Sequence, residues 1–178
     1  MRISLVITVI GADRPGLVES VAWVVADCGG NWLDSRMARL GGQFAGMVRV
    51  ELPAEREAAL RSSLATMQEK GLTVMVGGVS ATDSGQESEG RTSARLELVG
   101  QDRPGIVRQI TGVLVAHAVN VEELTTGTES APMSGGLLFR AVLEVSLPPG
   151  LRLEALRADL EEIAADLMVD VDLKPVST

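Results

Sequence analysis

The chain has 178 residues, a formal net charge of −8 and a single cysteine. A direct grip on a nucleic-acid backbone needs clustered lysine and arginine, whereas this chain has only two lysines and its arginines are scattered among carboxylates. Cys28 cannot form an intrachain disulfide, which fits a reducing cytoplasm, and we expect it to be a buried structural thiol. No apolar run is long enough to cross a bilayer. The composition therefore predicts a cytoplasmic protein with no direct contact to nucleic acid or membrane.

A motif of eight residues occurs twice in the chain. Residues 11–18 read Gly-Ala-Asp-Arg-Pro-Gly-Leu-Val, and residues 100–107 read Gly-Gln-Asp-Arg-Pro-Gly-Ile-Val. The match continues at one constant offset, pairing Leu17, Val21, Val25 and Asn31 with Ile106, Ile110, Leu114 and Asn120. A repeat of this length indicates a duplicated domain. Since residues 81–91 contain no large apolar side chain, we expect domains at 1–80 and 92–178 joined by a linker at 81–91.

In the first copy, alternating apolar residues predict a strand at residues 3–10. Asp13 has the residue type of a helix N-cap, and Pro15 would then lie in the first helical turn. An apolar helical stripe follows, and Gly29-Gly30-Asn31 is expected to end that helix. The remaining predicted elements are strands at about 32–40, 44–52 and 72–79, a Gly41-Gly42 hairpin turn and a helix at 54–70.

The second copy repeats this order, with a longer hairpin at Glu129–Gly136. A βαββαβ order predicts a four-stranded antiparallel sheet with both helices on one face, the ferredoxin-like arrangement. We therefore expect an α+β protein of two ferredoxin-like domains. That fold supports many functions and does not decide among them.

The repeated Asp-Arg-Pro-Gly segment lies where a strand leads into a helix N-terminus. Unpaired N–H groups and the positive end of the helix dipole can hold a carboxylate or phosphate there. Glycine in a first helical turn costs roughly 1 kcal/mol relative to alanine, so we expect Gly16 and Gly105 to allow close approach by a ligand or a packed strand. The alternative is structural: Asp13 and Asp102 as helix caps, and the two asparagines as left-handed turn residues.

Catalytic and metal-binding patterns are missing from the sequence. No His, Cys and Asp cluster has metal-ligand spacing, and no nucleophile elbow, Walker loop or dinucleotide fingerprint occurs. We therefore expect no cofactor, no metal and no enzymatic activity. A small hydrolase similar to acylphosphatase, using Arg14 and Asn31, stays open as a third hypothesis.

A βαββαβ domain with Asp-Arg-Pro-Gly after its first strand and Gly-Asn before its second resembles the ACT domain. The segment from Gly30 to Gly46 and the tandem arrangement resemble the glycine cleavage system transcriptional repressor family. The resemblance implies a regulatory protein whose paired domains bind a small amino acid at their interface, with glycine as effector and a DNA-binding activator as partner. It places the ligand-binding residues at Ala12, Asp13, Gly16 and Asn31 in one copy, and at Gln101, Asp102, Gly105 and Asn120 in the other.

The first hypothesis is thus a non-enzymatic amino-acid sensor acting on transcription through a protein partner. Its two domains would pair by sheet edges or by helices, and a homodimer would be compatible with it. The second hypothesis is an interaction module without a ligand, in which the motif is only a cap and a packing glycine.

Overall fold

The computed structural model describes residues 1–79, 90–130 and 136–176, and the chain divides into two units, Met1–Ser84 and Gly85–Thr178. Of the predicted linker at 81–91, only Gly90 and Arg91 lie within the described residues. Residues 131–135 of the predicted longer hairpin also lie outside them.

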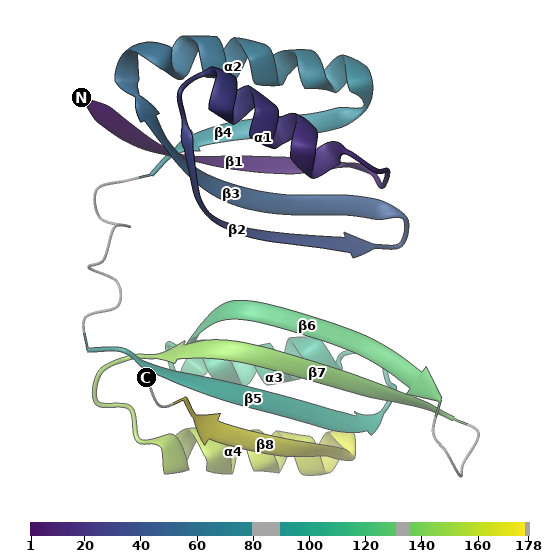
Figure 1. Ribbon diagram of the computed structural model, residues 1–178. Coiled ribbons are helices and arrows are strands. Elements are labelled where there is room, and N and C mark those ends of the chain that lie inside the picture. Colours follow the sequence, from purple (N-terminus) through teal and green to yellow (C-terminus); the bar gives the residue numbers. More distant parts are fainter. Residues whose placement is uncertain (80–89, 131–135, 177–178) are drawn as a thin grey trace. The chain divides into compact units, whose positions relative to one another are not determined.

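The first unit has the predicted βαββαβ order and forms one antiparallel sheet with the strand order β2-β3-β1-β4 (Figure 1). Both helices cover the same face of this sheet. Its elements are β1 (Arg2–Ala12), α1 (Leu17–Asp27), β2 (Asn31–Leu40), β3 (Gln43–Pro53), α2 (Glu57–Ala65) and β4 (Leu72–Gly78).

The second unit repeats this topology with the strand order β6-β7-β5-β8. Its elements are β5 (Thr92–Gln101), α3 (Ile106–Ala116), β6 (Asn120–Ser130), β7 (Leu137–Leu147), α4 (Leu153–Leu167) and β8 (Val169–Pro175). The predicted α+β class and the two ferredoxin-like units are confirmed. In each unit the second strand, β2 or β6, lies at an edge of the sheet, where its outer backbone groups have no neighbouring strand among the described residues.

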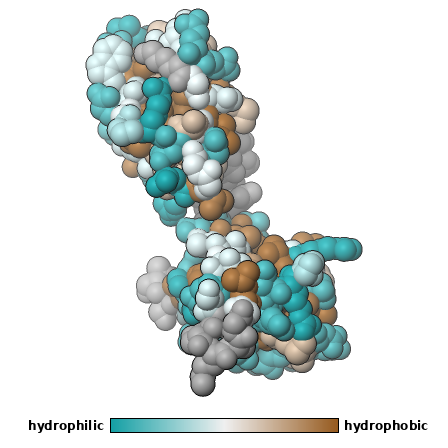
Figure 2. Space-filling view, turned by 90° about the vertical axis from the view of Figure 1, so that its right-hand side faces the viewer, coloured by the Kyte–Doolittle hydropathy of each residue, from teal (hydrophilic) through white to brown (hydrophobic). Residues whose placement is uncertain are grey.

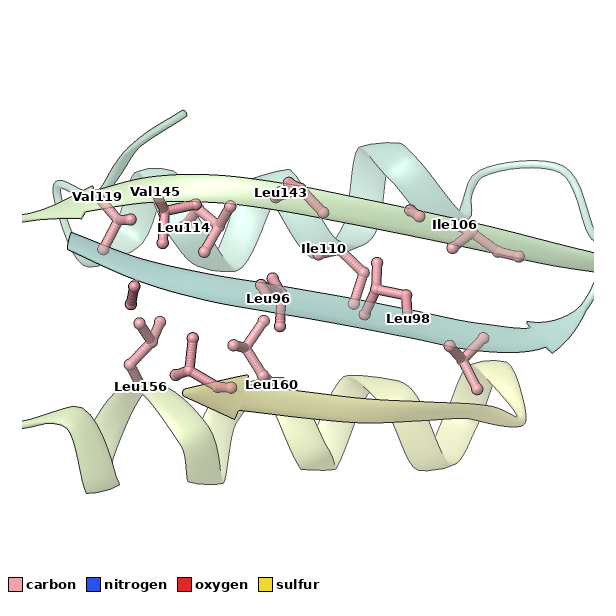
Figure 3. Close-up of a cluster of buried hydrophobic side chains, with 14 of the residues drawn as sticks. Leu96, Leu98, Ile106, Ile110, Leu114, Val119, Leu143, Val145, Leu156 and Leu160 are labelled. Atoms are coloured by element: carbon pink, nitrogen blue, oxygen red, sulfur yellow. The ribbon is translucent and has the colours of Figure 1, made fainter. Parts of the chain in front are cut away.

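Each unit has its own hydrophobic core between the sheet and its two helices. Figure 3 shows this core in the second unit, where alternate residues of β5 and β7 point toward α3 and α4. Leu96 and Leu156 are fully buried there. Leu60 of α2, which corresponds to Leu156 of α4, is fully buried in the first unit. Because the two cores are separate clusters, each copy of the repeat buries its own apolar face.

Two local predictions were wrong. The helix expected at residues 54–70 is a shorter α2 flanked by 3₁₀ segments at Ala54–Arg56 and Thr66–Lys70. The asparagines do not supply left-handed turns: Gly29 (φ 69°) and Ala118 (φ 53°) do so, and Asn31 and Asn120 begin the strands that follow.

Candidate functional site

The repeated motif forms the same backbone bend in both units. Gly16, at φ 87° and ψ 1°, is the N-cap of α1, and Gly105, at φ 94° and ψ −2°, is the N-cap of α3. Both lie in the left-handed region, which glycine enters without the steric cost that a Cβ atom brings. The sequence pattern predicts these glycines within the first helical turn. In the structure they precede that turn.

The helix caps predicted at Asp13 and Asp102 are also wrong, because the N-cap residues are Gly16 and Gly105, and no capping side chain accepts a hydrogen bond at either helix start. The Asp13 carboxylate instead lies 2.8 Å from Nε of Arg39 in an ion pair. The N-cap residue of α1 and of α3 is thus a glycine, which offers the first-turn N–H groups no side-chain acceptor, and these groups lie at the positive end of each helix dipole.

The segment before each glycine is fixed to the neighbouring hairpin. Ala12 is the last residue of β1 and pairs with Gln43, and the next residue, Asp13, donates its backbone N–H to the Gly42 carbonyl at 2.9 Å. The second unit repeats this contact, with the Asp102 N–H donating to the Leu137 carbonyl at 2.9 Å. This anchoring holds the motif at the hairpin end of each sheet.

Open space surrounds the two glycines. A Cβ atom built on Gly16 would meet no other atom within 4 Å, and on Gly105 it would meet only Nε2 of Gln109, at 3.8 Å. The expected close approach by a packed strand is therefore wrong at these positions. Close packing occurs at Gly11 and Gly100, where a Cβ atom would lie 2.6 Å from the carbonyl oxygens of Gly71 and Met168, respectively.

The structure does not bring the predicted asparagines to the glycines within one unit. Asn31 pairs with Glu51, which pairs with Ser4 near the beginning of β1, whereas Gly16 follows the end of β1. The eleven residues of α1 separate the two positions by roughly 16 Å at about 1.5 Å per residue. Asn120 is likewise at the end of its sheet opposite to Gly105, and its Nδ2 donates to Glu122 at 2.8 Å.

The same separation leaves the hydrolase hypothesis without a site in the first unit. Arg14 follows β1 at one end of the sheet and Asn31 begins β2 at the other, so they cannot act on one phosphate. Across residues 1–79, 90–130 and 136–176, no three His, Cys, Asp or Glu side chains are placed to hold a metal ion. No helix in those ranges is long and apolar enough to cross a membrane.

Comparison with known families fits this repeated architecture. Residues 4–77 match one model of the ACT domain, and residues 94–161 match a second. The chain is a tandem ACT-domain protein. The two ACT domains fall within the two structural units and include the β1–α1 and β5–α3 bends.

Relatives of this ACT-domain protein include named regulators. The "Glycine cleavage system transcriptional repressor" of Escherichia coli (strain K12) is 30% identical over 128 residues, which are 71% of this chain and 66% of the relative. The repressor of the same name from Shigella flexneri matches equally well. The chain thus spans just under two thirds of these curated relatives and is their distant homologue.

Solved structures show the same fold. The crystal structure of an unknown protein from Galdieria sulphuraria is 32% identical, with a TM-score of 0.84 and coverage of 99% of this chain and 100% of that one. A putative glycine cleavage system transcriptional repressor has a TM-score of 0.72 and 20% identity, covering 100% of this chain and 99% of its own. The latter identity supports the fold alone.

The Asp13–Arg39 ion pair could not be predicted from the motif, because the hairpin register that brings Arg39 to the loop is not visible in a linear sequence. The arginine has no counterpart in the second ACT domain, where Thr128 occupies the equivalent place. The bend is therefore common to both copies, whereas the side chains around it differ.

Proposed function

We propose that this tandem ACT-domain protein is a non-enzymatic regulator that senses a small amino acid, glycine or a similar one. It acts on transcription through a protein partner, a DNA-binding activator, and does not contact DNA itself. The names of its curated relatives support the regulatory role. The net charge of −8 supports the indirect action, since direct binding to DNA needs a basic surface.

The observation that carries this proposal is the left-handed glycine that begins a helix without a side-chain cap in both domains. Each glycine has open space around it, so an α-carboxylate can approach the first-turn N–H groups. Ala12 and Asp13, with Gln101 and Asp102 in the second copy, form the adjoining wall at the hairpin end of each sheet.

Asn31 and Asn120 cannot orient the ligand's amine beside the glycine of their own ACT domain, since they lie at the far end of each sheet. Suppose that the edge strand β2 or β6 of a second copy pairs antiparallel with the same strand of the first copy. The beginning of the second copy's strand then lies beside the end of the first copy's strand. In a homodimer paired in this way, the asparagine of the partner copy would lie at the same end of the sheet as the glycine of the first copy. This pairing accounts for why both residue types recur in each copy.

Regulation follows if the ligand binds the paired form better than the unpaired form. Only such differential affinity can shift the population toward the form that holds or releases the protein partner.

A thermal-shift screen of the full chain against the twenty amino acids tests the proposal, because a ligand that binds the folded state raises the melting temperature with its concentration. We expect such a rise for glycine or serine. A flat screen at millimolar concentrations, repeated by calorimetry, would count against sensing.

Substitutions at the glycines separate a binding role from a structural one. Gly16→Ala adds only a Cβ atom and backbone strain, whereas Gly16→Asn fills the open space with less strain, because asparagine enters the left-handed region more readily. We expect the asparagine variants at positions 16 and 105 to lose more affinity than the alanine variants. Loss of affinity in proportion to loss of stability would show that the glycines only maintain the bend.

The second candidate function is an interaction module without a ligand, and the exposed aromatic side chain of Trp23 favours it. This side chain is 63% exposed on α1, and tryptophan is enriched at the centres of protein interfaces. The module predicts that no amino acid changes the melting temperature, while Trp23→Ala weakens binding of a transcriptional activator in pull-down experiments with purified partners.

A further inference from the structure

We infer that the open face of the second ACT domain carries a separate binding site for a small zwitterion, such as an α-amino acid, between Glu129 and Arg140. This site lies on the β6–β7 strand pair and shares no residue with the glycine bends of the proposed function.

The site is an open depression of about 230 Å³ on the β6–β7 hairpin. This volume is below the roughly 300–1,000 Å³ of sites for drug-sized ligands, and it suits a molecule of amino-acid size. The residues that line it are Thr125, Thr126, Gly127, Thr128, Glu129, Arg140 and Val142.

The strand register places the charged groups on the sheet face that the helices leave uncovered. Ala141 and Leu143 of β7 are buried against the helices, so Arg140 and Val142 between them point to the other face. Gly127 pairs directly with Arg140, and Glu129 is two residues further along β6 on the same face.

Glu129 and Arg140 present one negative and one positive charge in the same depression. Nη2 of Arg140 lies 3.2 Å from Oε1 of Glu129, and both side chains are 53% exposed. Such an exposed ion pair contributes little to stability, so a ligand can compete with it. The remaining guanidinium N–H groups suit a carboxylate, and the second oxygen of Glu129 suits an ammonium group.

The depression is open at Gly127 because glycine has no side chain to fill it. A Cβ atom there would meet nothing within 4 Å, and its φ is not in the left-handed region, so the backbone does not require glycine. Glycine within a strand weakens the strand, and one recognised use of it is to let a ligand approach closely.

The first ACT domain lacks this chemistry at the equivalent register positions. There Ala38 pairs with Ala45, where the second domain has Gly127 and Arg140. Leu40, in the place of Glu129, is 82% exposed and carries no charge. The double variant Glu129→Leu with Arg140→Ala therefore reproduces residues that the same fold already accommodates in its other copy.

The test is an amide NMR titration of the full chain with the twenty α-amino acids, up to about 10 mM, where a ligand with a Kd of 1 mM is mostly bound. We expect saturable shifts at Thr125 and Gly127 for at least one amino acid. No saturable shift with any of the twenty would overturn the inference. Serine, ethanolamine and 3-hydroxypropanoate then form a matched series, and either single-charge analogue shifting these amides as strongly as serine would overturn the zwitterion assignment.

Variants locate the site. Gly127→Val fills the depression without removing a charge, and we expect it to abolish the shifts while the melting temperature stays the same or rises, because valine favours strands. The Glu129→Leu, Arg140→Ala variant should also abolish them. The matched control is Arg95→Ala, since Arg95 pairs with Glu97 at 2.8 Å on the same sheet but lines no part of the depression.

The outcome also separates this site from that of the proposed function. Shifts at Gly127 that survive Gly105→Asn and disappear in Gly127→Val support the inference whether or not the bend binds a ligand. Shifts that disappear in Gly105→Asn and survive Gly127→Val would place the ligand at the bend and overturn the site proposed at Arg140.

Discussion

Replacing Gly16 tests whether its left-handed backbone conformation, and not a lack of space, is what requires glycine. The φ of 87° places it where an L-residue with a Cβ atom pays about 1–2 kcal/mol, and the open surroundings add no clash. We therefore expect Gly16→Ala to lower the free energy of unfolding by about 1–2 kcal/mol. Gly16→Asn should lower it less, because asparagine adopts this conformation more readily.

Gly11 is the matched comparison, five residues earlier in the same unit. Its φ is not left-handed, but a Cβ atom would lie 2.6 Å from the Gly71 carbonyl oxygen and 3.2 Å from a methyl carbon of Leu72. Overpacking of this kind costs about 1–3 kcal/mol, or more where backbone must move. The larger asparagine side chain should therefore be worse than alanine at Gly11, which reverses the order expected at Gly16.

Urea denaturation of the full chain, followed by tryptophan fluorescence, measures these differences. Both tryptophans of the chain, Trp23 and Trp32, lie in the first unit, so the fluorescence change reports the unfolding of that unit. If Gly16→Asn unfolds at a lower urea concentration than Gly16→Ala, strain at a positive φ is not the reason for the glycine. If the order at Gly11 is not reversed, the close approach to Gly71 does not govern that position.

Three further predictions concern the core, the thiol and a surface ion pair. Leu156→Ala should lower the free energy of unfolding by about 2–5 kcal/mol in urea denaturation followed by circular dichroism, because Leu156 is fully buried. Burial raises the pKa of the Cys28 thiol, so the folded chain should react slowly with a thiol reagent such as DTNB. Because the thiol of the unfolded chain ionises at lower pH than that of the folded chain, the free energy of unfolding should fall as the pH rises past the ordinary thiol range. Asp34→Asn should change the free energy of unfolding by less than about 1 kcal/mol in the same urea assay, although Asp34 and Arg49 lie 2.7 Å apart, because both are solvent-exposed.

The element order was predictable because the repeat supplies the same signal twice. Alternating apolar residues mark each central strand, and the apolar residues that recur at helical spacing in segment 54–70, Leu60, Leu64 and Met67, are buried. The broken helix at residues 54–70 was not predictable from this stripe. Apolar spacing fixes which side of a segment is buried, and it does not distinguish an α-helical from a 3₁₀ turn at the ends.

The caps were mispredicted because the aspartate of Asp-Arg-Pro-Gly can either cap the helix or bind the neighbouring hairpin. An aspartate before a proline suits a helix N-cap, but the Asp13 N–H is bound to Gly42 and its carboxylate to Arg39. These contacts come from the hairpin, which lies more than twenty residues further along the chain. With Asp13 held there, the chain turns through the left-handed glycine before the helix can begin.

The distance between each glycine and asparagine was, in contrast, implied by the element order. The helix that follows the first strand returns the chain to the strand's beginning, so the next strand has to start at the end opposite to the glycine. The depression at Arg140, in contrast, could not be predicted from the element order. It depends on which residue of β6 faces Arg140, and that register is set by a hairpin whose length differs between the two copies.

The differences between the copies bear on which bend suits a carboxylate. The first turn of α1 contains Glu19, whereas the equivalent position in α3 is Arg108. A carboxylate at a helix N-terminus already interacts with the positive end of the dipole and repels a second anion, while an arginine adds to the attraction. Since the backbone bend is the same in both domains, the local charge is what distinguishes them. It favours an anionic ligand group at Gly105 over Gly16.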